Sequence, residues 1–253
     1  MLFLISPAKS LDFEATDVSL KSKPRLLADT NKLIKNLRQK SHDDIKSLMH
    51  LSDNLAALNV GRYQSFALRY SDEQGKQAAL AFKGDVYIGM DVSDFETVDF
   101  EYAQQHLRIL SGLYGFLKPM DLIQPHRLEM GTRLANDNGT NLYKFWDDKI
   151  TKLVNKDLAA SGSQNIINLA SNEYFKSVHK KELQGNLYNI SFLDEKNGQY
   201  KVISFYAKKA RGMMCRYAIK HKISNPEDLK GFDLGGYAFS EDMSSGNNWT
   251  FIR

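Results

Sequence analysis

Apolar residues are spaced along this chain in two patterns, which together predict strands alternating with helices. Met1–Ile5 is an unbroken apolar run that stops at Ser6, as expected of a buried strand entering a loop. Residues 24–40 instead place apolar side chains three and four positions apart with lysine and arginine between them, which indicates an amphipathic helix. Ser41 followed three residues later by Asp44 has the spacing of a helix N-cap, so a second helix is predicted to start there.

The same two patterns assign most of the remaining chain. Further helices are predicted over residues 53–66, 99–110, 141–161 and 171–178, and from residue 207 onward. Further strands are predicted over residues 165–170, 187–193, 200–205 and 249–252, and residues 78–82 and 85–88 are read as short strands or as strand and turn. Asn197-Gly198 is the clearest hairpin signal of the chain. Residues 122–134 fit neither pattern.

Strands separated by helices, together with one hairpin, predict the mixed α/β class. Because no stretch of the 253 residues has the composition of a linker, we predict a single domain over residues 1–253, with a mixed central sheet surrounded by helices. Hydrophobic residues at 42% and charged residues at 25% are values of ordinary globular proteins. The opening apolar run is too short for a signal peptide, and no run approaches the length of a membrane span. We therefore expect a cytoplasmic protein with no membrane partner and no obligate protein partner.

Two glycines three residues apart, Gly112 and Gly115, follow the predicted helix 99–110 and enclose Leu113 and Tyr114. Such a pair allows a sharp turn, and a turn that feeds a new helix leaves backbone N–H groups free to bind a phosphate. The string Leu-Ser-Gly-Leu-Tyr-Gly resembles the hairpin of the helix-hairpin-helix motif, which binds nucleic-acid backbones without regard to sequence. The alternative is an ordinary helix C-cap at Gly112, since Pro119 leaves room for barely one turn of a second helix.

The net charge of +4 permits contact with polyanions, and its distribution favours one segment. Residues 208–222 contain no acidic residue. Their basic residues are Lys208, Lys209, Arg211, Arg216, Lys220 and Lys222. Because these residues fall on the helix predicted from residue 207, they form the strongest electrostatic feature of the sequence.

Polar side chains also follow two of the predicted buried strands. Ser6, Lys9, Ser10 and Asp12 come after the first strand, and Asn172, Glu173, Tyr174 and Lys176 come after strand 165–170. Open α/β sheets bind ligands at the carboxyl ends of their strands. Segments 6–12, 172–176 and 206–211 are therefore predicted to form a pocket, with a simple surface ion pair between Lys9 and Asp12 as the alternative.

Common catalytic and cofactor motifs are missing from the sequence. Neither a dinucleotide-binding Gly-x-Gly-x-x-Gly, a P-loop nor a nucleophile elbow occurs. The single cysteine, Cys215, excludes an intrachain disulfide framework and a cysteine-rich metal site. His42 and Asp44 have a His-x-Asp spacing, but the capping interpretation of this stretch is the stronger one. We therefore predict no metal site and no cofactor.

Five ordered strings resemble the peroxide stress protein YaaA family (UPF0246, DUF328) over essentially the whole chain. They are Leu4-Ile-Ser-Pro-Ala-Lys-Ser-Leu-Asp12, Ala81-Phe-Lys-Gly-Asp-Val-Tyr87, Gln104-Gln-His-Leu-Arg-Ile-Leu-Ser-Gly-Leu-Tyr-Gly115, Asn168-Leu-Ala-Ser-Asn-Glu-Tyr-Phe-Lys-Ser-Val178 and Phe205-Tyr-Ala-Lys-Lys-Ala-Arg-Gly212. The resemblance implies a cytosolic bacterial protein that protects against hydrogen peroxide by keeping free intracellular iron low. It also implies DNA binding and an unusual fold containing a helix-hairpin-helix element.

The leading functional hypothesis is sequence-independent binding of DNA through its backbone, because phosphate contacts need backbone N–H groups and basic side chains. The candidate DNA contacts are Gly112, Leu113, Tyr114, Gly115, Lys118, Lys208, Lys209, Arg211 and Arg216. The competing hypothesis is an enzyme acting on a nucleotide-like or nucleic-acid substrate in the predicted pocket, with Glu173 as acid or base beside a lysine. Its catalytic candidates are Lys9, Asp12, Glu173, Lys176, Lys209 and Arg211. Direct iron sequestration ranks last, because the sequence shows no ligand spacing for it.

Overall fold

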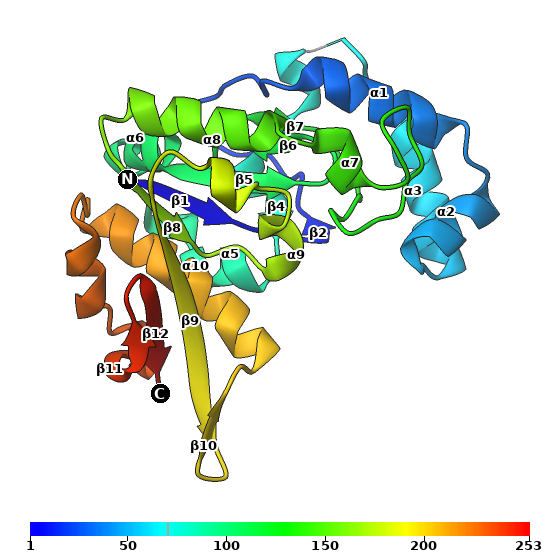
Figure 1. The fold of residues 1–253 in the computed structure, drawn as a ribbon. Coiled ribbons are helices and arrows are strands. Elements are labelled where there is room, and N and C mark those ends of the chain that lie inside the picture. The colour runs from blue at the N-terminus through cyan, green and yellow to red at the C-terminus, as the bar shows by residue number, and fades with distance from the viewer. Residues whose placement is uncertain (70) are drawn as a thin grey trace.

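The computed structural model describes residues 1–69 and 71–253 as an arrangement of helices around a central sheet (Figure 1). The strands are β1 (Leu2–Ile5), β2 (Ser10–Leu11), β3 (Lys76–Gln77), β4 (Phe82–Lys83), β5 (Leu107–Ser111), β6 (Gly115–Leu117), β7 (Leu122–Ile123), β8 (Asn165–Asn168), β9 (Asn186–Lys196), β10 (Gln199–Lys201), β11 (Ala238–Ser245) and β12 (Asn248–Ile252). The α-helices are α1 (Leu27–Arg38), α2 (His42–Met49), α3 (Asp53–Ser65), α4 (Ala78–Ala81), α5 (Asp85–Met90), α6 (Thr97–His106), α7 (Leu142–Trp146), α8 (Lys149–Ala160), α9 (Asn172–Phe175) and α10 (Ser204–Lys220). Short 3-10 helices are η1 (Asp72–Gln74), η2 (Val92–Asp94), η3 (Lys180–Glu182), η4 (Pro226–Gly231) and η5 (Leu234–Gly236).

The central sheet has eight strands and is mixed. Five parallel strands form its middle in the order β12-β9-β8-β1-β5. Antiparallel strands close both edges, β11 beside β12 and β6 beside β5, and β10 folds back on β9 as the predicted Asn197-Gly198 hairpin. The predicted mixed α/β class with a mixed central sheet is therefore confirmed.

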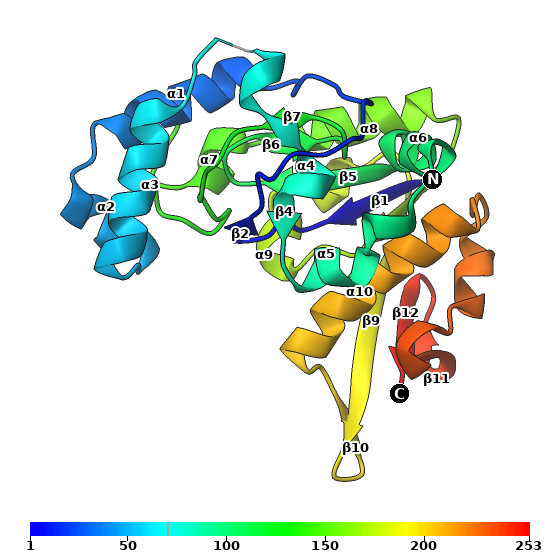
Figure 2. The same ribbon diagram turned by 180° about the vertical axis from the view of Figure 1, so that it is seen from behind.

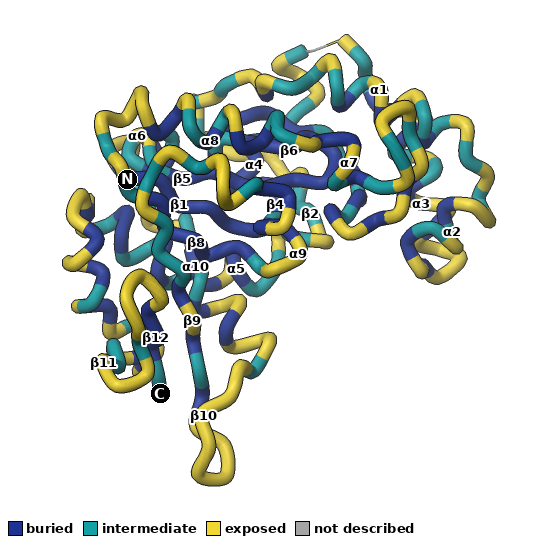
Figure 3. Tube along the Cα trace, viewed as in Figure 1, coloured by how far each residue is buried: buried dark blue, intermediate teal, exposed yellow. Residues whose placement is uncertain are grey.

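Helices cover both faces of this sheet. α8 lies over one face, whereas α5 and α10 lie over the other (Figures 1 and 2). α1, α2 and α3 gather at one end of the molecule, and the β9–β10 hairpin projects from the body with an exposed tip (Figure 3). The predicted helix start at Ser41 is confirmed, since Ser41 forms a capping box with Asp44. The helix predicted over residues 53–66 is α3, and the Ser52 side chain caps it by accepting the N–H of Leu55.

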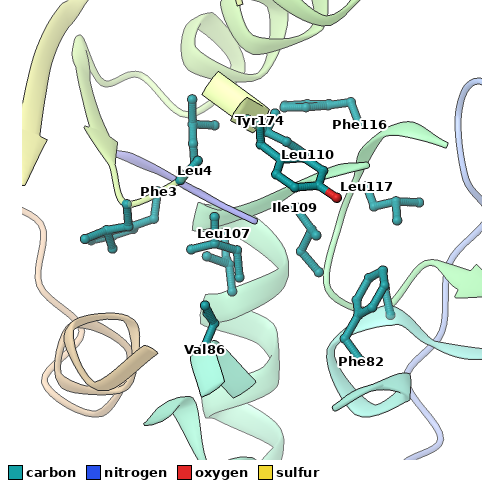
Figure 4. Packing of buried hydrophobic residues seen from close by; sticks show 14 of the residues in the cluster. Phe3, Leu4, Phe82, Val86, Leu107, Ile109, Leu110, Phe116, Leu117 and Tyr174 are labelled. Atoms are coloured by element: carbon teal, nitrogen blue, oxygen red, sulfur yellow. The ribbon is translucent and has the colours of Figure 1, made fainter. Parts of the chain in front are cut away.

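The core lies on the two faces of β1 and β5. Because side chains alternate along a strand, Leu107 and Ile109 point toward Phe82 and Val86, whereas Leu110 points the other way, toward Tyr174 (Figure 4). All four residues of β1 are buried, which explains why its sequence is apolar throughout rather than alternating.

The segment around Gly112 and Gly115 is a β-hairpin, so the predicted helix-hairpin-helix element is wrong here. α6 ends at His106, and the chain continues as β5 beside β1 before it returns as β6. Leu107 and Leu110 have the three-residue spacing of a helix face, but Leu107 and Ile109 also have the two-residue spacing of one face of a short buried strand. Periodicity could not separate the two cases over so few residues.

This hairpin is packed inside the protein, with Leu113 and Tyr114 at most 1% exposed. A Cβ on Gly112 would lie 2.2 Å from the carbonyl oxygen of Leu128, and one on Gly115 would lie 2.8 Å from the Trp146 ring. Gly115 also has a φ of +69°, which favours glycine. The two glycines therefore serve a tight internal turn, and the predicted phosphate contact at their N–H groups does not fit this packing.

Three further predictions of secondary structure are wrong. Residues 78–81 and 85–88 form helices α4 and α5 rather than strands, because alanine favours helix and because α5 packs closely against α10, and only Phe82 of the first run lies in a strand, β4. The predicted helix 141–161 is divided into α7 and α8 at Asp147, whose φ is +43°. The predicted strand 200–205 ends at Lys201, and α10 begins at Ser204.

Candidate functional site

The carboxyl ends of β1 and β8 meet because these two parallel strands are neighbours in the sheet. Ser6 follows β1 and Ser171 follows β8. The Ser6 hydroxyl lies 3.3 Å from that of Ser171 and accepts the Ser171 N–H at 2.9 Å. The chain leaves β1 toward β5 and leaves β8 toward β9, on the opposite side. This boundary is the kind of switch point at which open α/β sheets bind ligands.

α5 and α10 reach the same edge of the sheet because they pack against each other without side chains between them. A Cβ on Gly212 would lie 1.7 Å from the carbonyl oxygen of Val86, and one on Gly89 would lie 2.0 Å from that of Lys209. Only glycine permits this backbone contact. The close crossing fixes where Arg211, next to Gly212, projects from α10.

A cavity of about 570 Å³ lies between these elements. Its lining comes from the loop after β1, from β4 and the start of α5, from the loop before Gly131, from α9 and from α10. The lining residues are Ser6, Pro7, Ala8, Lys9, Ser10, Lys83, Gly84, Asp85, Val86, Glu129, Ser171, Asn172, Glu173, Tyr174, Lys208 and Arg211. This volume is typical of pockets that bind small molecules or cofactors.

Most of the charged side chains in this lining form ion pairs. Lys9 pairs with Glu129 at 2.7 Å, and Lys208 lies 4.0 Å from Asp85. Lys83 pairs at 3.3 Å with Asp12, which lies just outside the lining. These three pairs leave Arg211 and Glu173 as the lining charges that have no ionic partner among the described residues.

Of the two unpaired lining residues, Arg211 and Glu173, only Arg211 is half-buried. Its Nε is buried and, like that of Arg127, has no hydrogen-bond partner among the described residues. Arg127 differs in that its Nη2 donates to Glu129 at 3.1 Å. Burial lowers the pKa of the Arg211 guanidinium, because no neighbouring carboxylate compensates for lost hydration. An uncompensated guanidinium at a cavity wall is a site for an anion.

The predicted pocket is formed only in part by the residues proposed for it. Lys9, Glu173 and Arg211 do line one cavity. The alternative of a Lys9–Asp12 pair is wrong, because Lys9 pairs with Glu129. Asp12 instead accepts the Glu14 N–H and binds Lys83 and Lys76, which lowers its pKa to about 2 and keeps it ionised.

Lys176 and Lys209 lie outside the lining. The Lys176 ammonium sits 5.1 Å over the Tyr143 ring, and it forms no ion pair with Glu173 among the described residues. Lys209 is exposed on α10. The lining also includes Lys83, Asp85 and Glu129, which were not among the residues predicted for the pocket. The polar Lys83-Gly84-Asp85 break between two apolar runs was the available signal for two of them.

The residues predicted to contact DNA are in three different environments. Gly112, Leu113, Tyr114 and Gly115 are buried in the core, and Lys118 is half-buried beside them. Arg216 pairs with Asp94 at 2.6 Å. Lys208 and Lys209 are exposed at the start of α10, where Phe205 and Tyr206 are also exposed.

The basic helix is also less cationic than its sequence suggested. Lys220 and Lys222 both pair with Asp99, and Lys220 lies 3.7 Å from Asp94. Although burial opposes ionisation of Asp99, the Lys222 and Lys220 ammonium groups lower its pKa to about 2. The carboxylates therefore neutralise the C-terminal half of α10. Nearer its start Lys208 pairs loosely with Asp85, and Lys209 and Arg211 form no ion pair among the described residues.

The described residues contain no group of three or more His, Cys, Asp or Glu side chains that could hold a metal ion. Within the same residues, no helix is both long enough and apolar enough to cross a membrane.

Comparison with known proteins agrees with the resemblance found in the sequence. The family model of peroxide stress protein YaaA matches residues 1–243. The chain belongs to this family. Similar members are a UPF0246 protein of Alteromonas mediterranea, 51% identical over 100% of this chain and 98% of the relative, and one of Saccharophagus degradans, 50% identical over 100% and 99%. A UPF0246 protein of Teredinibacter turnerae is 51% identical over 100% of this chain and 99% of its own length. Membership of the YaaA family supports a role in peroxide stress.

Proposed function

We propose that the protein binds a phosphate-bearing, nucleotide-like molecule in the cavity between β1, β8 and α10, and that its role in peroxide stress depends on this binding. The unpaired guanidinium of Arg211 is the observation that carries the proposal. A buried charge without a partner lowers the stability of a protein. A binding site is a physical reason for keeping such a charge, because the ligand completes the pair.

The rest of the lining supports a phosphate at Arg211. A guanidinium presents planar, paired donors that match phosphate oxygens. Lys208 comes from the same helix three residues earlier, and its pairing with Asp85 is loose at 4.0 Å. The hydroxyls of Ser6, Ser10 and Ser171 add neutral donors to the same lining. The cavity volume of about 570 Å³ leaves room for a sugar and a base beyond the phosphate.

Isothermal titration calorimetry with adenosine 5′-monophosphate, adenosine and inorganic phosphate tests this proposal. We expect the nucleotide to bind more tightly than the nucleoside, and Arg211→Met to weaken nucleotide binding at least tenfold, by analogy with the cost of losing a charged hydrogen bond. Lys209→Met is the matched control, because it removes an exposed cation from the same helix outside the cavity, and it should change affinity less than twofold. Equal affinity for nucleotide and nucleoside, or unchanged binding in Arg211→Met, would refute the proposal.

DNA-backbone binding is the second function that we propose, now without the buried hairpin. The exposed start of α10 and the neighbouring hairpin favour it, because Lys208 and Lys209 stand there beside Phe205, Tyr206 and Tyr200, which are 56%, 42% and 42% exposed. Basic side chains bind phosphates and aromatic rings stack on bases. With two or three cations engaged, log affinity should fall against log salt with a slope of about −2 to −3.

Different substitutions test the DNA proposal and the nucleotide proposal. Lys209→Ala, which removes an exposed cation outside the cavity, should weaken binding of unrelated duplexes alike. Gly115 is buried and offers no contact surface for DNA. A salt-independent affinity, or a strong preference for one sequence, would rule out backbone binding by this surface.

The cytosolic location and the lowering of free iron are proposed from the family resemblance. If the cavity serves iron control, cells carrying Arg211→Met should contain more chelatable iron after peroxide than cells with the wild-type protein. Electron paramagnetic resonance of the chelated iron measures this. Equal iron levels in the two strains would disconnect the cavity from iron control.

A further inference from the structure

We infer that the ligand of this cavity carries a hydrogen-bond donor as well as an anion, and that it is a mononucleotide whose base bears an amino group. The inference rests on the proposed function and names the ligand class of the same site. It follows from a second unpaired charge in the lining, which has the sign opposite to that of Arg211.

That second charge is Glu173. The other two carboxylates of the lining are already engaged, since Glu129 accepts from Lys9 at 2.7 Å and from Arg127 at 3.1 Å, and Asp85 faces Lys208 at 4.0 Å. Glu173 forms no ion pair among the described residues. No ion pair joins it to Arg211 either, so the cavity keeps two opposite charges apart.

The Glu173 side chain is held in place by the backbone rather than by a cation. Its Oε1 accepts the N–H of Gly131 at 2.9 Å, and its own carbonyl oxygen accepts the Tyr143 hydroxyl at 2.9 Å. The other carboxylate oxygen, Oε2, has no hydrogen-bond partner among the described residues. A carboxylate accepts hydrogen bonds and donates none. Glu173 therefore selects for a donor on the ligand.

An amino-bearing base meets this requirement at its exocyclic group, whereas its carbonyl counterpart has an acceptor there and keeps a donor only at the adjacent ring nitrogen. Cytosine and adenine present an exocyclic amine where uracil and hypoxanthine present an oxygen, and that oxygen would face the Glu173 carboxylate as acceptor against acceptor. Glu173 is exposed in the ligand-free protein. A ligand that fills the cavity covers this carboxylate, and a covered polar group without its hydrogen bond disfavours analogues that lack the donor. With the phosphate at Arg211 and the amine at Glu173, one ligand compensates both unpaired charges.

The test compares cytidine with uridine 5′-monophosphate, and adenosine with inosine 5′-monophosphate, by titration calorimetry of the wild-type protein. We expect the amino-bearing member of each pair to bind at least tenfold more tightly. Glu173→Gln should reduce each preference to less than threefold, because the amide keeps an acceptor for the Gly131 N–H and adds donors of its own.

Two controls separate specificity from affinity. Arg211→Met should weaken both members of a pair by a similar factor and leave their ratio unchanged. Glu101→Gln, which removes an exposed carboxylate on α6 outside the cavity, should leave the ratio at the wild-type value. Circular dichroism and the urea midpoint show that each variant is folded.

The outcomes are distinguishable. If both members of each pair bind wild type equally, or if Glu173→Gln keeps the full preference, the inference is wrong and the proposed anion site stands. If none of the four nucleotides binds, the proposed function itself fails.

Discussion

Two arginines near the central sheet are held in opposite ways. Arg108 on β5 is 3% exposed, and its Nε donates to Asp157, while its terminal nitrogens donate to the carbonyl oxygens of Gln104 at 3.0 Å and Gln105 at 3.1 Å. Asp157 also accepts two bonds from Arg25, at 2.6 and 3.0 Å. Arg211 has no such partners among the described residues.

Arg108 and Arg211 therefore differ in whether the protein itself satisfies their hydrogen bonds. The Arg108 cluster joins β5, α8 and the segment before α1, so its hydrogen bonds are satisfied within the protein and contribute to holding the fold together. Arg211 lines a cavity, and under the proposed function a bound ligand supplies its hydrogen bonds. The comparison predicts that changes at the Arg108 cluster alter stability, whereas changes at Arg211 alter binding.

The largest expected effect is at the centre of the satisfied cluster. Asp157→Asn leaves Arg25 and Arg108 facing each other without their carboxylate, and breaking a buried pair costs about 3–5 kcal/mol. Urea unfolding followed by circular dichroism measures the loss. Asp94→Asn is the control, because that carboxylate is 55% exposed and should cost under about 1 kcal/mol. Similar losses for the two variants would mean that the cluster is not a special source of stability.

The next effect tests how the cavity wall is built. Gly212→Ala places a Cβ 1.7 Å from the Val86 carbonyl oxygen, so α10 must shift, at a cost of about 1–3 kcal/mol. The shift should also weaken nucleotide binding, because Arg211 moves with the helix. Gly61→Ala is the control: nothing lies within 4 Å of the added methyl, and alanine should stabilise α3 by about 0.5–1 kcal/mol. A Gly212→Ala protein with wild-type stability would contradict the close crossing.

A smaller effect on stability is expected at low pH. Burial opposes ionisation of Asp157, but Arg25 and Arg108 outweigh it and lower the pKa of the carboxyl below its ordinary 3.8. A lowered folded-state pKa contributes stability that is present above pH 3.8 and is lost as the pH falls through the folded-state value. The stability gap between wild type and Asp157→Asn should therefore narrow below pH 3.8. A gap that stays constant until acid unfolding would disagree with this sign.

The smallest effect is expected at Arg211 itself. Replacing it with methionine removes a charge that has no partner in the protein, so the free energy of unfolding should change by less than about 0.5 kcal/mol or rise. Thermal and urea unfolding of Arg211→Met measure this. A loss of several kcal/mol would show that Arg211 is structural, which would remove the contrast with Arg108.

The sequence predicted the fold class and part of the site for identifiable reasons. The local sequence determines the structure of the Met1–Ile5 strand and of the Asn197-Gly198 turn. The expectation that ligands bind at the carboxyl ends of strands placed Ser6, Glu173 and Arg211 in one predicted pocket. The Gly112–Gly115 turn was misread because its glycines fit a surface hairpin and a buried one equally well. Burial is decided by distant partners such as Leu128 and Trp146.

The sequence also could not show which charged side chains form ion pairs, because the partners are distant in the chain. Lys220 and Arg216 lie more than 120 residues from the carboxylates that pair with them, Asp99 and Asp94. The basic run therefore looked uniform, although among the described residues only Lys209 and Arg211 of this run form no ion pair. Glu129 was missed because it belongs to a segment with no regular pattern.

A crystal structure of the protein soaked with adenosine 5′-monophosphate tests the central claim most directly. The account predicts the phosphate in the cavity, with oxygens about 2.7–3.1 Å from the Arg211 guanidinium nitrogens, and the base directed toward Glu173. A nucleotide bound elsewhere, with Arg211 still unpaired at an empty cavity, would contradict it.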